Sequence, residues 1–365
     1  MTDFTASAKP ETEEQEPSWK TEEKEPSWSR YKLVPRITIS HNSAEVFSVR
    51  FDPEGKYIAA GCGDGALRVF NSHTGGLAYN LQGGSNATLP TTSVRFRPPE
   101  NESSKSKHIL LAANTAGILQ HWHTMSGKCV HSMEEAEGNQ VYALDYFDYG
   151  GQFVTAGKDT ALRIYDEATK SLVTTMQGGV RHGTKDPAGH SNRIFSVKVN
   201  PHDQDMILSG GWDNTVQIWD TRKGGAVSSI FGPHLCGDAL DIHDYTLLTG
   251  SCRDSTQLEM WDIRTCTRIC EIPYVTAKPC KLYAAQFSKD PAGRFIAAGG
   301  SGANEAKVFD RSRGDNSVVG TITGLSRGVF TVDFSPDQTK LAIAGGDSTI
   351  RIFDLVSRDG DDGAK

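Results

Sequence analysis

The sequence lacks the features that mark membrane-spanning and secreted proteins. No run of apolar residues reaches the roughly 18–20 residues that a membrane-spanning helix needs. The first residues, MTDFTASAKPETEEQE, have neither a basic start nor an apolar core, so they do not read as a secretory leader. We therefore expect no membrane partner and a cytoplasmic or nuclear protein, in which thiols stay reduced.

Catalytic motifs and metal-ligand spacings are also missing. The sequence contains no G-x-S-x-G, no G-x-x-x-x-G-K-[ST] and no H-E-x-x-H. Its seven cysteines include no Cys-x-x-Cys pair, since the nearest two, Cys266 and Cys270, are four residues apart. His121 and His123 share one face of an expected strand, but no further ligand lies near them, and we expect a surface pair. The sequence predicts no catalysis, no cofactor and no metal.

Strong positive charge is another absence. The net charge is −7, and the first thirty residues, with eight acids and four bases, account for −4 of it. The rest of the chain is only mildly acidic. A nucleic-acid surface needs clustered Lys and Arg, so we expect no nucleic-acid partner.

What the chain does contain is a repeating unit. The stretch Gly189–Asp220 opens with Gly-His, closes with Trp-Asp and holds three short apolar runs separated by turn residues, the pattern of strands. The unit recurs seven times, at about the 40–45 residues of a four-stranded propeller blade. The seven copies are Val46–Asn71, Thr91–His123, Val141–Asp166, Gly189–Asp220, Cys236–Asp262, Leu282–Asp310 and Val329–Asp354.

These copies resemble the WD-repeat β-propeller family. Gly189-His190 and Trp219-Asp220 carry the resemblance, and the other copies close on related pairs such as Phe353-Asp354. The resemblance implies an all-β, seven-bladed propeller over residues 33–356, with a disordered acidic arm (1–32) and a disordered tail (357–365). In the family an N-terminal strand completes the last blade, and Leu33–Ser40 fits that role because the seventh copy has only three strands.

The arm contains a tandem repeat. Thr12–Trp19 (TEEQEPSW) is followed by Thr21–Trp28 (TEEKEPSW). Two tryptophans in an acidic, proline-containing segment could form a docking motif, because aromatic anchors carry much of the binding energy at interfaces. The alternative is a duplicated low-complexity segment in which Trp28 only packs on the propeller.

The resemblance also assigns structural roles within the fourth copy. His190, Ser209, Asp213 and Trp219 match the family's internal hydrogen-bond chain. A buried carboxylate needs donors, and the imidazole and hydroxyl supply them. This set looks like a catalytic triad, but its serine is expected inside a sheet, away from any substrate.

The family binds partners on the top face of the propeller, around the central channel. The positions implied are the start of each inner strand and the residue before each turn aspartate. They are Phe47, Tyr142, Lys158, Phe195, Trp212, Asp238, Arg253, Tyr283 and Phe330. Aromatics with Arg are typical of interface hot spots, so we expect a non-catalytic scaffold that binds peptides or proteins as a monomer within a larger complex.

Two alternatives remain open at this point. The fourth and fifth copies continue as WDTR and WDIR. This resembles the sequence box by which substrate receptors of cullin-RING ubiquitin ligases contact an adaptor. The resemblance implies that Arg222 and Arg264, on the bottom face, make that contact. An Arg after a strand-terminal Asp also makes an ordinary surface ion pair. A histone- or chromatin-binding propeller is the other alternative, and it would require an acidic pocket on the top face.

Overall fold

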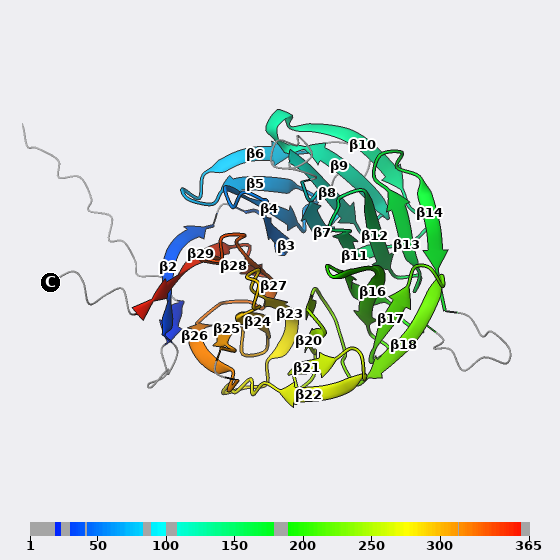
Figure 1. The fold of residues 1–365 in the computed structure, drawn as a ribbon. Helices are drawn as coiled ribbons and strands as arrows, with labels where there is room; N and C mark the ends of the chain where they lie inside the picture. Colours follow the sequence, from blue (N-terminus) through cyan, green and yellow to red (C-terminus); the bar gives the residue numbers. More distant parts are fainter. Residues whose placement is uncertain are drawn as a thin grey trace, which may run out of the picture.

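The computed structural model describes residues 19–22, 30–40, 42–82, 89–99, 108–178, 189–312 and 314–358. Within these residues the chain forms seven antiparallel sheets, arranged as blades around a central channel (Figure 1). The predicted all-β, seven-bladed propeller is confirmed. None of the described residues belongs to a helix long and apolar enough to cross a bilayer.

The strands of a blade follow one another along the chain, from the inner strand at the channel to the outer strand at the rim. Blade 1 is β3 (Val46–Phe51), β4 (Tyr57–Cys62), β5 (Leu67–Asn71) and β6 (Leu77–Leu81); blade 2 is β7 (Thr91–Phe96), β8 (Ile109–Asn114), β9 (Ile118–His123) and β10 (Lys128–Glu134). Blade 3 is β11 (Val141–Tyr146), β12 (Gln152–Gly157), β13 (Leu162–Asp166) and β14 (Leu172–Met176); blade 4 is β15 (Ile194–Asn200), β16 (Asp203–Gly211), β17 (Thr215–Asp220) and β18 (Gly225–Phe231).

The last three blades follow the same order. Blade 5 is β19 (Leu240–His243), β20 (Thr246–Gly250), β21 (Leu258–Asp262) and β22 (Thr267–Glu271); blade 6 is β23 (Lys281–Phe287), β24 (Phe295–Ser301), β25 (Ala306–Asp310) and β26 (Ser317–Thr323). Blade 7 is β27 (Val329–Phe334), β28 (Lys340–Gly345), β29 (Ile350–Ser357) and, from the other end of the chain, β2 (Tyr31–Ile39).

The core lies between neighbouring blades. Between blades 3 and 4, for example, the fully buried Trp219 belongs to one apolar cluster with Ile194 and Val197 of its own blade and with Val154 and Leu162 of blade 3. Both faces of such a sheet are covered, which explains why its inner strands read as short, nearly continuous apolar runs.

The N-terminal segment closes the ring as predicted. β2 pairs antiparallel with β29, from Tyr31 opposite Ser357 to Ile39 opposite Ile350. It therefore starts two residues before the expected Leu33. Leu33 is 5% exposed and packs in the cluster between blades 6 and 7. This pairing removes the open edge that β29 would otherwise present to other chains.

The structure describes two short stretches of the expected arm, residues 19–22 and 30–32. β1 (Lys20–Glu22) adds a fifth strand to blade 6, with Lys20 opposite Thr323 and Glu22 opposite Thr321 of β26. The ring of Trp19 meets that of Phe353 edge-on at 5.8 Å, and the Arg351 guanidinium lies 5.5 Å from its centroid. The first copy of the tandem repeat thus ends in a contact with the propeller; Trp28 lies outside the described residues.

Candidate functional site

A cavity of about 410 Å³ opens at one end of the central channel, which we call the top face. We call this cavity the top-face funnel. Six of the nine top-face residues predicted from the sequence line it, together with Thr92, Arg95 and Cys236 among others. The six are Phe47, Tyr142, Phe195, Asp238, Tyr283 and Phe330.

A β-bulge places each aromatic side chain of the funnel. In six blades the pairing between the inner strand and the next strand skips one residue, as at Phe47 between Val46 and Ser48. The other skipped residues are Thr92, Tyr142, Phe195, Tyr283 and Phe330. A bulge re-aims the extra residue, here toward the channel.

In four of the six blades a glycine lies opposite the bulge, at a place where a side chain would clash with the backbone. A Cβ at Gly211 would lie 2.1 Å from the carbonyl oxygen of Arg193, and one at Gly300 would lie 1.9 Å from that of Lys281. Gly157 and Gly345 are equally constrained. Blade 5 differs, because β19 pairs with β20 without a bulge and Asp238 stands in the aromatic position.

The aromatic rings form two arcs. In one, Phe330 stacks on Phe47 at 5.7 Å and meets Tyr283 edge-on at 5.7 Å. In the other, Tyr142 stacks on Phe195 at 4.7 Å. Such pairs add about 0.5–1.5 kcal/mol beyond simple burial. All five rings are only partly buried, so the funnel offers a preformed apolar wall with Thr92 and Asp238 at the two breaks between the arcs.

The floor of the funnel is charged but internally compensated. Asp238 forms ion pairs with Arg50 and with Arg95, the latter at 2.9 Å, and it accepts a hydrogen bond from the Ser196 hydroxyl at 3.2 Å. Burial, helped by the nearby Arg95, lowers the pKa of Arg50 to about 9. Among the described residues that line the funnel, Asp238 carries the only carboxylate, and two guanidinium groups already pair with it.

Below the funnel, a belt of polar residues surrounds the channel at one equivalent position in each inner strand. We call it the channel belt, and it consists of Arg50, Arg95, Asp145, Lys198, Asp241, Gln286 and Asp333. It was not predicted from the sequence. A sequence signal for the belt was available, because each member lies three residues after the residue of the same blade that lines the funnel.

Each of the belt's three aspartates links its own blade to the next one. Asp145 accepts the backbone N–H of Val199 at 3.0 Å, Asp241 that of Phe287 at 2.9 Å, and Asp333 that of Phe51 at 2.7 Å. These N–H groups belong to inner strands, and the edge of an inner strand that faces the channel has no neighbouring strand with which to pair. Two of the belt's cations pair with these acids, Arg95 with Asp145 and Lys198 with Asp241, both at 3.3 Å. The belt thus satisfies buried polar groups rather than presenting a reactive set.

The three predicted residues that precede turn acids do not line the funnel. Trp212 lies beside it: its ring is 4.9 Å from that of Phe195, the Arg193 guanidinium lies 5.1 Å from its centroid, and its Nε1 donates to Cys236 Sγ at 3.2 Å. Lys158 is exposed. Arg253 turns inward, donating to Glu259 at 3.0 Å.

The internal network predicted for blade 4 is present in the structure. His190 bonds through Nδ1 to Asp213 at 2.7 Å and through Nε2 to Ser209 at 2.8 Å, and Trp219 Nε1 donates to Ser209 at 2.7 Å. Burial alone would raise the pKa of Asp213, but His190 and the donors of Ser191 and Thr215 lower it overall. The set is enclosed between sheets, which fits a structural role. In blade 5 the corresponding Asp254 is exposed and takes no part in such a network.

The burial of His121 contradicts the expectation that His121 and His123 form a surface pair. The His121 side chain is fully buried, and Nε2 lies 3.0 Å from Glu167 of blade 3, which also pairs with Lys170 at 2.5 Å. Burial lowers the pKa of His121 despite the hydrogen bond that its ring donates to the Glu167 carboxylate. Sequence reasoning missed this inter-blade contact because Glu167 lies 46 residues away. Among the described residues, no three His, Cys, Asp or Glu side chains gather as metal ligands would.

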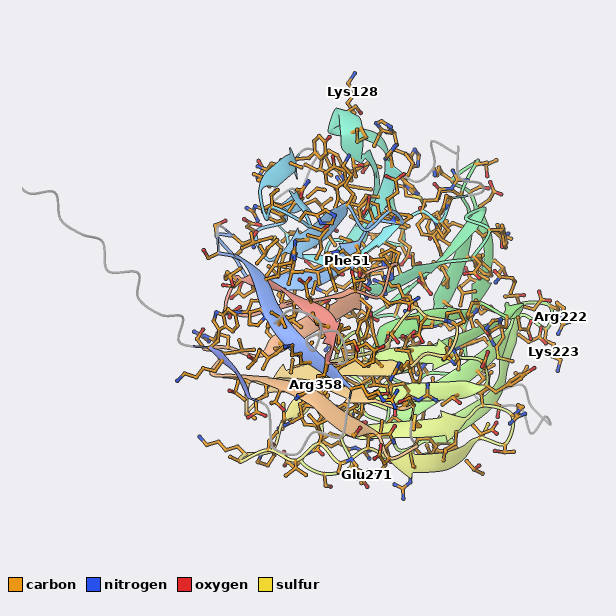
Figure 2. All side chains as sticks on the ribbon, turned by 60° about the vertical axis from the view of Figure 1, so that its left-hand side comes forward. Phe51, Lys128, Arg222, Lys223, Glu271 and Arg358 are labelled. Carbon is orange, nitrogen blue, oxygen red and sulfur yellow. The ribbon has the colours of Figure 1, made fainter. Side chains whose placement is uncertain are left out.

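The bottom face carries the two predicted arginines. Arg222 and Arg264 occupy equivalent positions after β17 and β21, and their side chains are 68% and 61% exposed. Figure 2 shows Arg222 at the edge of the molecule. Each is held by the aspartate two residues earlier, through contacts of 3.1 Å to Asp220 and 2.7 Å to Asp262. The Arg264 hydrogen bond lowers the pKa of Asp262 to about 2.

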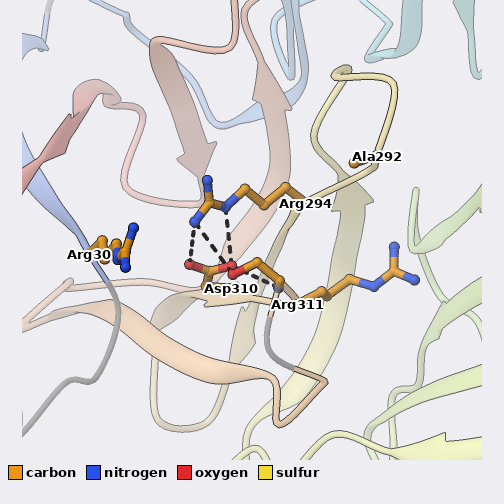
Figure 3. A pocket seen from close by; sticks show the side chains of 6 residues that line it. Arg30, Ala292, Arg294, Asp310 and Arg311 are labelled. Atoms are coloured by element: carbon orange, nitrogen blue, oxygen red, sulfur yellow. Dashed lines mark hydrogen bonds and ion pairs between the residues drawn. The ribbon is translucent and has the colours of Figure 1, made fainter.

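A second cavity, of about 520 Å³, lies where the start of β2 meets blade 6. Arg294 binds both carboxylate oxygens of Asp310, at 3.3 and 3.2 Å, and donates to the Tyr31 hydroxyl at 3.2 Å. Figure 3 shows that the Arg311 side chain points away from this pair. These contacts fasten the closing strand to blade 6.

Comparison with known proteins agrees with this architecture. The family model described as "WD domain, G-beta repeat" matches residues 33–71, 127–166, 184–220 and 316–354. A serine-threonine kinase receptor-associated protein of Dictyostelium discoideum is 26% identical over 324 residues, which are 86% of this chain and 97% of that protein. A ribosome biogenesis protein WDR12 homolog of Drosophila mojavensis is 22% identical over 82% of this chain and 70% of its own length.

A third relative is the cell division cycle 20.1 protein of Arabidopsis thaliana, a cofactor of the APC complex. It is 20% identical over 253 residues, and the match covers 68% of this chain but only about half (51%) of that protein. The four matched repeats lie within a closed ring of seven four-stranded blades, whose fourth blade holds the family's hydrogen-bond network. The chain is therefore a member of the WD-repeat β-propeller family.

Proposed function

We propose that this protein is a non-catalytic scaffold that binds a protein or peptide partner in the top-face funnel. The observation that carries the proposal is the preformed cavity of about 410 Å³ walled by five partly exposed aromatic rings. Binding sites are concave and mostly apolar, with a few placed polar groups, and aromatic anchors dominate interface energetics. The names of relatives support the proposal, since they include an APC cofactor, a ribosome biogenesis protein and a pre-mRNA-splicing factor.

The chemistry of the funnel favours an apolar or aromatic side chain of the partner. Its walls are aromatic, and its carboxylate, Asp238, is already paired with Arg50 and Arg95. Among the described residues of the funnel, a cationic side chain of a partner would find no free anion. This charge balance argues against a reader of lysine- or arginine-rich histone tails, which would need an acidic pocket. Relatives named for ribosome biogenesis and splicing favour a nuclear pool beside the cytoplasmic one.

Affinity purification with mass spectrometry tests the proposal. The full chain would be compared with the Phe47→Ala, Phe330→Ala pair and with a matched control, Phe231→Ala, whose ring is 75% exposed on the outer strand β18. Truncation of an interface anchor costs about 2 kcal/mol or more, roughly 30-fold in affinity. We expect the double variant to lose partners that the control keeps. Equal partner sets for both would refute the proposal, provided that circular dichroism shows both are folded.

A second candidate function is that of a substrate receptor of a cullin-RING ubiquitin ligase, which would bind the adaptor of that ligase through its bottom face. The observation that favours it is the pair of exposed arginines at equivalent positions of adjacent blades, each oriented by its own aspartate. The Arg222→Ala, Arg264→Ala double variant should then lose an adaptor while it keeps the partners of the funnel. If the wild-type protein captures no such adaptor, the arginines act only within their own turns.

A further inference from the structure

Two cysteines of blade 5 meet at the rim of the top-face funnel. Cys236 lines the cavity and Cys252 follows β20, and each side chain is only partly buried. The backbone N–H of Cys252 donates to the carbonyl of His234 at 2.8 Å, which holds the two segments side by side. The two thiol groups are within hydrogen-bonding reach of each other, and both are unoxidised.

The pair joins the two aromatic arcs across blade 5. On one side, Trp212 Nε1 donates to Cys236 Sγ at 3.2 Å, and Trp212 packs on Phe195. On the other side, Cys252 lies within hydrogen-bonding reach of the Tyr283 hydroxyl. The contacts therefore run from blade 4 through both thiols to blade 6. They cross the blade in which Asp238 replaces the aromatic residue of the ring.

The surroundings make the two thiols unequal. The Cys236 thiol hydrogen bond lowers the pKa of Cys252 to about 6, outweighing burial, and Tyr283 and Lys281 lower it further, against a small opposing effect of Asp254. The same hydrogen bond and burial raise the pKa of Cys236. A partly exposed thiolate beside a second thiol is the arrangement of peroxide-sensing cysteines, in which one sulfur reacts and the other resolves.

We propose that Cys236 and Cys252 form a peroxide-oxidisable pair, and that their disulfide alters partner binding in the funnel. The second part rests on the proposed function. The Cys252 thiolate attacks the terminal oxygen of a hydroperoxide: an S–O bond forms, the O–O bond breaks, and the departing alkoxide or hydroxide takes a proton from solvent, which leaves an alcohol or water and the Cys252 sulfenic acid. Cys236 sulfur then attacks the Cys252 sulfur, the S–O bond breaks, and water leaves with the Cys236 proton. A dithiol reductant reverses the disulfide.

The disulfide would change the funnel through groups already in contact. Cys236 Sγ is the acceptor for Trp212 Nε1, and Trp212 supports Phe195 in the funnel wall. Formation of the S–S bond moves this acceptor and removes the thiol proton that Cys236 shares with Cys252. The expected result is a repositioned Trp212–Phe195 arc and a changed affinity for partners.

The test treats the full chain with substoichiometric hydrogen peroxide, blocks remaining thiols with N-ethylmaleimide and maps peptides by mass spectrometry without reductant. We expect a peptide cross-linked through Cys236 and Cys252 that dithiothreitol removes. In Cys236→Ser, Cys252 should accumulate as a sulfenic acid that dimedone traps. In Cys252→Ser, Cys236 should stay reduced.

Cys129 provides the internal control, because it is exposed and burial raises the pKa of its thiol. At pH 7 a larger fraction of Cys252 than of Cys129 should therefore be thiolate, and Cys252 should be oxidised first. Preferential oxidation of Cys129, or the absence of a cross-linked peptide from the folded protein, would refute the proposal that Cys236 and Cys252 form an oxidisable pair.

Partner capture before and after oxidation tests the second part separately. We expect oxidation to change capture at least about threefold in the wild type and not in Cys252→Ser. Unchanged capture with a demonstrated disulfide would overturn the effect on binding. Failure of the Phe47→Ala, Phe330→Ala variant to lose partners would refute the funnel as the binding site, and the disulfide mapping would stand on its own.

Discussion

Phe47 and Phe330 stack with ring centroids 5.7 Å apart and planes only 7° from parallel. One ring belongs to the first blade and the other to the last, so this contact in the funnel wall lies at the junction that closes the propeller. Closure of the fold and assembly of the candidate site are therefore linked. The closing strand β2, the bulges of the inner strands and the blade 4 network each allow a direct test.

The closing strand should contribute strongly to stability. Leu33 is 5% exposed in the cluster between blades 6 and 7, so Leu33→Ala should lower the free energy of unfolding by about 2–5 kcal/mol through lost burial and a new cavity. Val356 in β29, opposite Lys32, is 37% exposed. Val356→Ala should therefore change stability by less than about 1 kcal/mol. Chemical denaturation measures both, and similar losses would contradict the assigned closure.

The bulge glycines should not tolerate a methyl group. In Gly211→Ala, the new Cβ would lie 2.1 Å from the Arg193 carbonyl oxygen, so the backbone must shift and stability should fall by about 1–3 kcal/mol. At Gly225 in the outer strand β18, a Cβ would meet no heavy atom within 4 Å apart from its chain neighbours. Gly225→Ala should be neutral or slightly stabilising. Comparable melting temperatures for the two variants would count against the bulge geometry.

The Asp213 carboxylate should stabilise the protein in a pH-dependent way. Its folded-state pKa lies below its ordinary value, so its contribution is present above the unfolded pKa of about 3.9 and is lost as the pH falls through the folded pKa. Asp213→Asn should cost about 1.5–3 kcal/mol at pH 7, and the difference from wild type should shrink below about pH 4. Asp254→Asn, at the exposed equivalent position of blade 5, is the control. A pH-independent difference would contradict an ionised Asp213.

Much of the fold was predictable because it is encoded by local, repeated signals. Turn residues, short apolar runs and strand-closing aromatic-aspartate pairs recur in phase, so blade number and the closing role of residues 33–40 could be predicted. The aromatic funnel could be predicted for the same reason, since its residues occupy one position of each repeat. Six of the nine expected residues line it.

What escaped prediction depends on contacts between distant residues. The N–H of Phe51 meets Asp333, 282 residues away, and His121 meets Glu167 of the next blade. No local pattern reveals such partners. Arg253 also illustrates this, because only the folded chain shows that buried Glu259 turns its side chain away from the funnel. Likewise, the strand at Lys20–Glu22 depends on the free edge of β26 rather than on its own sequence.

The most direct test takes a partner that the wild-type protein captures and measures the affinity of this partner for the Phe47→Ala, Phe330→Ala variant. Isothermal calorimetry or surface plasmon resonance would compare it with wild type and with Phe231→Ala. We predict that the double variant loses at least about 30-fold in affinity and the control less than about twofold. Affinity that is unchanged in a folded double variant would contradict the assignment of the top-face funnel as the binding site.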